Sequence, residues 1–245
     1  MAITFHGVSS VPVDNGTSTA TQITVTPPAS MTAGDLVYVT CYQRGTATFS
    51  VGVNGGQSWN TLGRVVDGTT NATAAFWATY NGTWSANPRF DFSAGTNTNV
   101  VMLVFSPTDT GKIFGVDTAE TTSTFAAPTT PFTVTIPGRT PVNASNVSVA
   151  TWITADDNTW GTLAGTNWVK TSLSAQYRNT SGNDMSSTYA YQIQTTAAAT
   201  NNVSQNQTAL GGDAGVYRII TFYEYDPPAT ALVDVIGRGI IPWAR

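Results

Sequence analysis

The sequence has few charged residues, and those it has are not clustered. Asp, Glu, Lys and Arg make up 10% of the 245 residues, against roughly 25% in an average soluble protein. Lysine occurs only twice, as Lys112 and Lys170, and the arginines are scattered along the chain. Because a phosphate-binding surface needs clustered Lys and Arg, the composition argues against a nucleic-acid partner.

Residues that bind metals or act as nucleophiles are equally scarce. His6 is the only histidine and Cys41 the only cysteine, so the sequence offers neither a Cys/His zinc site nor an internal disulfide. A Ser-His-Asp triad would have to use His6, and no G-x-S-x-G motif supplies its serine. Cys41 lies in the apolar run LVYVTCY, and we interpret it as a small core residue.

Asp and Glu are the remaining candidate catalytic residues, and their positions in the sequence are typical of turns instead of an active site. A glycosidase needs two carboxyl groups about 5–10 Å apart across a cleft. Asp91 lies in the segment RFDFS, and the pair Asp156-Asp157 precedes Asn158 and Trp160. No EF-hand spacing is present, so we interpret this pair as part of a turn. We therefore predict a non-enzymatic protein that has no cofactor and no metal site.

Long apolar runs and an export signal are also missing. No stretch approaches the ~20 apolar residues that span a membrane. The first ten residues, MAITFHGVSS, lack the basic and apolar regions of a secretory signal. We therefore expect no signal peptide, no transmembrane segment and no membrane partner.

Short extended segments separated by turn residues run through the sequence. The segments QITVTPP and PFTVTIP alternate apolar residues with threonine, as half-buried strands do. The runs LVYVTCY and NVVMLVF have the length of buried strands, and no helical period extends over 11 residues. This pattern predicts an all-β protein with an antiparallel β-sandwich.

The two halves of the sequence repeat the same order of segments. Ile23 matches Phe132 and Trp59 matches Trp168, both at a shift of 109 residues. Loop insertions account for the drift of three further matches, which are Val37 with Val147 at 110, Phe76 with Tyr189 at 113 and Val101 with Ile219 at 118. We predict an internal pseudo-duplication within one jelly-roll-like sandwich in which the copies interleave. Two tandem small sandwiches are the alternative.

These matches set the predicted boundaries. An N-terminal segment, 1–20, precedes a sandwich at 21–226, whose pseudo-repeats cover about 21–118 and 119–226. Each copy contains a Gly-x-x-Trp tetrapeptide, GQSW at 56–59 and GTNW at 165–168. Glycine allows a positive φ in a turn, and we interpret each Trp as a core residue that follows the turn. An exposed Trp that stacks on a sugar is the alternative.

The C-terminal residues 227–245 are unusually apolar for a segment that follows the last strand. Pro227-Pro228 breaks sheet pairing, and only Arg238 and Arg245 are cations. Arms of this kind join subunits of oligomers, and we predict a homo-oligomer. Packing on its own sandwich and a membrane-surface role are the alternatives. The predicted docking anchors are Leu232, Val235, Ile236, Ile240, Ile241 and Trp243.

Several of these features occur together in one family. The Gly-Asp-Leu strand opening at 34–36, the turn at 56–59 and the strand with Phe90 and Phe92 follow in order. Over about residues 20–225, the chain resembles β-sandwich structural proteins of tailed phages. The resemblance implies a virion protein of the capsid-decoration, head-fibre or tail-associated type, assembled in the host cytoplasm with other virion or capsid subunits. It implies no catalytic residue.

A carbohydrate-binding or receptor-binding module is the alternative function, with a glycan as partner. Trp84 in NGTWSANP and Trp160 in DDNTWG are the predicted sugar-stacking residues, because both lie in turn-rich segments. Exposure of their indoles would favour this function, and burial would argue against it.

Overall fold

Antiparallel strands form the framework of the chain. The computed structural model describes residues 2–11, 19–68, 70–126, 132–170, 176–179, 184–207 and 214–228, and these contain sixteen strands. None of these residues forms a helix that is long and apolar enough to cross a membrane. The predicted all-β class and antiparallel sandwich are confirmed.

The first eight strands form two sheets. In sheet order, the five-stranded sheet contains β1 (Thr4–Val11), β8 (Thr98–Ser106), β3 (Leu36–Arg44), β6 (Asn71–Thr79) and β5 (Asn60–Val66). The three-stranded sheet contains β2 (Gln22–Thr24), β7 (Arg89–Phe92) and β4 (Phe49–Val53).

The last eight strands form two sheets in the corresponding order. The five-stranded sheet contains β13 (Gln176–Asn179), β14 (Met185–Gln194), β11 (Asn146–Thr154), β16 (Gly215–Tyr225) and β9 (Ile113–Phe125). The three-stranded sheet contains β10 (Phe132–Ile136), β15 (Val203–Gln207) and β12 (Trp160–Ala164). Adding eight to each strand number of the first half reproduces these pairings, which is consistent with the predicted pseudo-duplication.

The pairing within each half is nested. β1 pairs with β8, β2 with β7 and β3 with β6, as in a long hairpin rolled onto itself. This nesting is consistent with the predicted jelly-roll-like wrapping. The innermost pair departs from it, because β4 pairs with β7 and β5 pairs with β6 instead of with each other.

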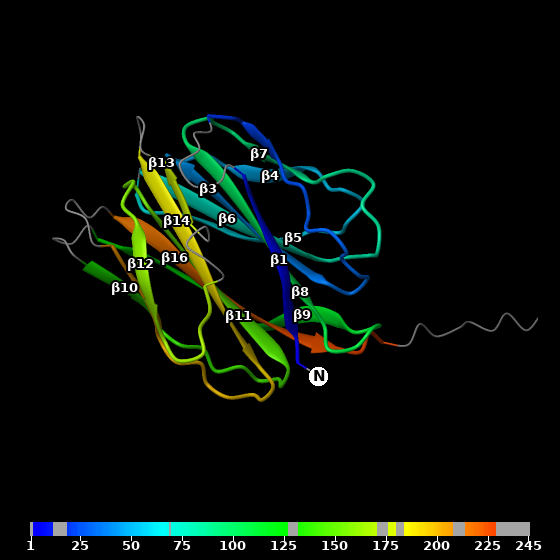
Figure 1. Ribbon diagram of the computed structural model, residues 1–245. Helices are drawn as coiled ribbons and strands as arrows, with labels where there is room; N and C mark the ends of the chain where they lie inside the picture. The colour runs from blue at the N-terminus through cyan, green and yellow to red at the C-terminus, as the bar shows by residue number, and fades with distance from the viewer. Residues whose placement is uncertain are drawn as a thin grey trace, which may run out of the picture.

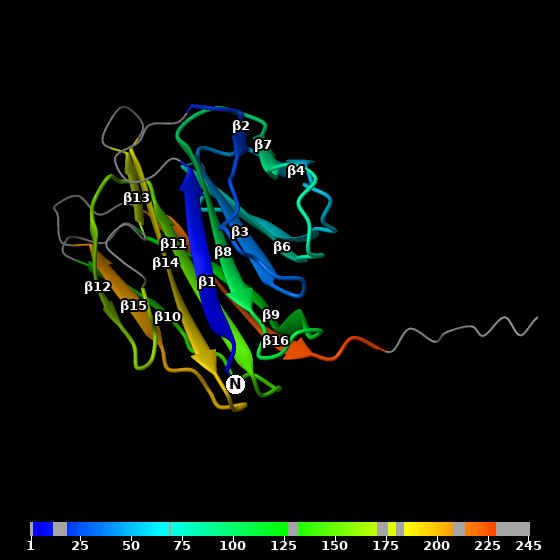
Figure 2. The same cartoon turned by 45° about the vertical axis from the view of Figure 1, so that its right-hand side comes forward.

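The four sheets form four layers. The two five-stranded sheets face each other across a central core, and a three-stranded sheet covers the outer face of each. Figures 1 and 2 show β2, β4 and β7 on one side of the molecule and β10 and β12 on the other. The central strands read as continuous apolar runs because both of their faces are buried.

This arrangement corrects the predicted organisation. The copies do not interleave in one sandwich, because each half forms its own pair of sheets. Strand β1 lies within the predicted N-terminal segment 1–20 and is part of a sheet. The predicted boundary at 118/119 falls inside β9, and the halves are joined instead at residues 107–112.

Three of the sequence matches between the halves are displaced by one residue. Val37 packs in the outer core of the first half, whereas Val147 packs in the central core. Leu36 is the structural counterpart of Val147, since Leu36 pairs with Phe105 and Val147 with Phe222 on the central face. The matches of Phe76 with Tyr189 and of Val101 with Ile219 also join opposite faces.

A buried arginine, paired with a glutamate of its own half, joins the two halves. Arg218 on β16 is 1% exposed, and its guanidinium donates to both carboxylate oxygens of Glu120 on β9, at 2.8 and 2.6 Å. It also donates to the backbone carbonyl oxygens of Thr73 on β6, at 3.0 Å, and of Gly63 on β5. One side chain of the second half thus binds two strands of the first, and its charge is satisfied inside the core.

Two tyrosines of β3 lie in the same central core. Tyr38 and Tyr42 are each 1% exposed. Burial raises the pKa of Tyr38 to about 12; the nearby Glu120 carboxylate adds to this rise, and Arg218 opposes it. Burial also raises the pKa of Tyr42 and of the Cys41 thiol, as expected for phenols and a thiol held away from water.

We expect Glu120→Gln to destabilise the protein by about 3 to 5 kcal/mol, because it leaves a buried guanidinium without its counter-charge. The free energy of unfolding in urea measures the loss. The control is Arg89→Gln, whose ion pair with Asp91 is about a third exposed, and which should cost less than about 1 kcal/mol. Equal losses in the two variants would contradict a special role for Arg218.

We expect the protein to lose stability as the pH rises from about 10 to 12. An unfolded tyrosine ionises near pH 10, whereas folded Tyr38 holds its proton to about 12. The unfolded state therefore releases protons first and becomes favoured over this range. Urea midpoints measured across it check the sign, and Tyr38→Phe should flatten the dependence. An unchanged slope in that variant would assign the effect to other groups.

Candidate functional site

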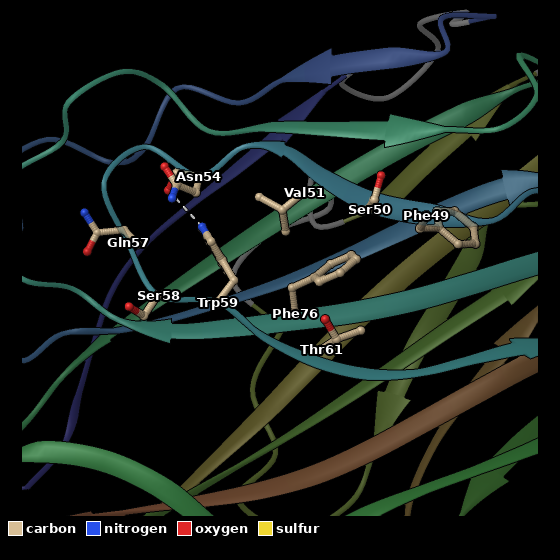
Figure 3. Close-up of a pocket in the computed structure, with 9 residues that line it drawn as sticks. All are labelled: Phe49, Ser50, Val51, Asn54, Gln57, Ser58, Trp59, Thr61 and Phe76. Carbon is tan, nitrogen blue, oxygen red and sulfur yellow. Dashed lines mark hydrogen bonds between the residues drawn. The ribbon is translucent and has the colours of Figure 1, made fainter.

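A groove opens where the first sandwich is not closed by strand pairing. Strand β4 lies in the three-stranded sheet and β5 in the five-stranded sheet, and residues 54–59 connect them. The cavity between them has a volume of about 450 Å³ (Figure 3). It is lined by Phe49, Ser50, Val51, Asn54, Gln57, Ser58, Trp59, Thr61 and Phe76.

The loop that carries Trp59 is held in one shape. Gly55 and Gly56 have φ of +65° and +84°, and a Cβ on Gly55 would lie 2.6 Å from the Trp84 indole. Buried Gln57 accepts a hydrogen bond from the Asn81 backbone amide at 2.9 Å. The first Gly-x-x-Trp tetrapeptide therefore forms a well-defined turn, as the sequence predicted.

Trp59 is fixed in orientation and half-buried. Its Nε1 donates to the backbone carbonyl of Asn54 at 2.9 Å, which is the dashed line in Figure 3. Its ring meets Phe90 edge-on, with centroids 5.5 Å apart. The indole N–H is thus already hydrogen-bonded within the protein, and the side chain presents apolar ring surface to the groove.

Trp168, the counterpart of Trp59, is a core residue. It is 6% exposed, and its Nε1 donates to the backbone carbonyl of Asn201 at 3.1 Å. Gly165 has a φ of +137°, so the second tetrapeptide is also a turn. The core interpretation is confirmed for Trp168, whereas Trp59 is part core and part groove wall.

Uncharged polar groups surround the aromatic surface. The side chains of Asn54, Ser58 and Thr61 are exposed, and the side-chain Oδ1 of Asn54 accepts a hydrogen bond from the Gly56 backbone amide at 3.0 Å. Within the described part of the chain, the hydroxyls of Ser58 and Thr61 and the Asn54 amide nitrogen make no hydrogen bond. All nine lining side chains are uncharged, so this groove can hold a neutral polar ligand.

The two tryptophans predicted to stack on a sugar lie in different environments. Trp160 is fully buried beside Trp152, with ring centroids 6.5 Å apart, so that prediction is wrong for Trp160. Trp84 is half-buried and stacks on Tyr80, with centroids 5.2 Å apart. They belong to different halves, and neither lines the groove.

The acidic residues considered for catalysis occupy structural positions. Asp91 forms a bidentate pair with Arg89 at 2.8 and 3.2 Å. Asp156 accepts from the backbone and side-chain nitrogens of Asn158, at 3.2 and 2.5 Å, as in an Asx turn. Among the described residues, no group of three or more His, Cys, Asp or Glu side chains could hold a metal ion.

The predicted docking anchors lie outside the described residues, which end at residue 228. Comparison of the chain with known protein families, with curated proteins and with solved structures finds no match in any of the three.

We expect Trp160→Ala to cost about 3 to 5 kcal/mol of stability, because it empties a closed part of the second outer core. Trp84→Ala should cost less than half as much, since that indole is half-buried at the surface of the first half. Urea unfolding of both variants tests the assignment. A larger loss for Trp84→Ala would reverse it.

Proposed function

We propose that this chain is a non-enzymatic virion structural protein of the capsid-decoration, head-fibre or tail-associated type. The observation that carries the proposal is the shared central core, in which Phe105 of the first half and Phe222 of the second pack in one cluster. Together with Arg218, this core makes two sandwiches into one stiff unit. Such a unit suits a component that transmits load and presents loops to its neighbours.

The composition of the surface supports contacts with other subunits. The outer strands present residues such as Thr24, Thr133 and Thr135, which are exposed and uncharged. Contacts made by hydroxyl and amide groups vary little with salt. The partners would be other virion or capsid subunits and further copies of the chain, assembled in the host cytoplasm.

In this proposal, residues 227–245 are the arm that fastens the subunit to its neighbour. Their sequence is apolar, and they follow Tyr225, the last residue of β16. An apolar segment gains stability when it is buried on a partner, at about 25 cal/mol per Å² of apolar surface.

We expect a chain that ends at Tyr225 to stay folded and to be monomeric, while the full chain forms a discrete oligomer. Light scattering gives the two masses, and urea unfolding shows that both chains are folded. A full-length Ile240→Asp, Trp243→Asp variant is the matched control and should also be monomeric. A shortened chain that keeps the mass of the oligomer would overturn the docking role.

Carbohydrate or receptor binding is the second candidate function, and the groove beside Trp59 favours it. The groove combines fixed aromatic surface with hydroxyl and amide groups, which is the lining that neutral sugars require. A particle protein can carry both functions, because the groove and the C-terminal arm are different parts of the chain.

A further inference from the structure

We propose that the groove between β4 and β5 binds a pyranose unit of a neutral glycan, with one site in each chain. The apolar face of the sugar would lie on Trp59, and its hydroxyl groups would bond to Asn54, Ser58 and Thr61. This inference gives the second candidate function a site and a ligand class, and it is independent of the assembly role.

The geometry of Trp59 is that of a prepared binding surface. The Nε1 bond to Asn54 and the edge contact with Phe90 hold the indole while its ring stays half-exposed. A ligand therefore pays little side-chain entropy to use this ring. A sugar ring presents C–H groups on one face, so it can cover an indole and still direct its hydroxyl groups to the sides.

The polar groups lie where those hydroxyls would be. Thr61 pairs with Phe76 across β5 and β6, so both side chains lie on the sheet face toward the groove. Asn54 and Ser58 flank the turn that carries Trp59. Hydroxyl groups donate and accept, and the Asn54 amide nitrogen donates, which matches the mixed hydrogen-bonding of a sugar.

The uncharged lining of the groove favours a neutral ligand over an anionic one. None of the nine lining residues is ionisable at neutral pH. A carboxylate or phosphate would be desolvated here without a cation to receive it, which is unfavourable. We therefore assign a neutral glycan instead of an acidic one.

In the second half, side chains of the protein itself fill the position that corresponds to the groove. The shift of 109 that relates Trp59 to Trp168 also relates Val51 to Trp160 and Thr61 to Lys170. Trp160 is fully buried. The Nζ of Lys170 donates to the Trp160 carbonyl at 3.3 Å and to Gln205 Oε1 at 3.1 Å. Among the described residues, this groove is therefore open in the first half and filled by Trp160 and Lys170 in the second, which predicts a single site.

The closed version supplies the variant for the test. Thr61→Lys copies the second half at an exposed position, so it should block the groove without unfolding the protein. The probes are neutral gluco-, xylo-, galacto- and N-acetylglucosamine oligosaccharides. Calorimetry and tryptophan fluorescence measure their binding to the protein. We expect one probe class to bind at one site per chain. Thr61→Lys and Trp59→Ala should each weaken binding at least about tenfold, or 1.4 kcal/mol.

Two controls make the result specific. Thr133→Lys places the same lysine at an exposed strand position of the second half and should bind like the parent chain, and urea unfolding shows which variants are folded. The proposal is overturned if no neutral probe binds, if binding survives Thr61→Lys, or if an acidic oligosaccharide binds more tightly. The chain ending at Tyr225 should keep its affinity, so loss of assembly and loss of sugar binding are separate outcomes.

Discussion

The burial of Arg218 between the two halves constrains much of the structure. A guanidinium inside an apolar core is tolerable only when a carboxylate and further acceptors surround it. Glu120 and the carbonyls of Thr73 and Gly63 meet this need, and they come from three different strands. Those strands must therefore keep their relative positions, and the two sandwiches are held in one alignment.

This constraint reaches the groove through β5. Gly63, one of the acceptors, lies where the register between β5 and β6 shifts. Pairing with β6 keeps β5 in the five-stranded sheet, whereas β4 pairs with β7 in the outer sheet. The two strands therefore diverge, and the space between them stays open beside Trp59. The contact that joins the halves is thus only two residues from Thr61 on the groove wall.

Much of the fold could be predicted because strands have a short and regular pattern. The alternation in QITVTPP and PFTVTIP and the apolar runs of β3 and β8 predicted strands that the structure contains. The sheet face that each side chain occupies was harder to predict, because a shift of one residue in register moves a side chain to the other face of the sheet. Val37 and Val147 look alike in sequence and lie in different cores. In strands buried on both faces, no polar alternation shows the register.

The sequence by itself determined the all-β class, the turns that carry Trp59 and Trp168, and the identity of Cys41 as a core residue. Only the tertiary structure decided that each half closes its own sandwich, that Trp160 is buried and that a groove lies between β4 and β5. These outcomes depend on contacts between residues far apart in the chain, such as the 98 positions between Glu120 and Arg218. Local patterns of side chains do not encode such distances.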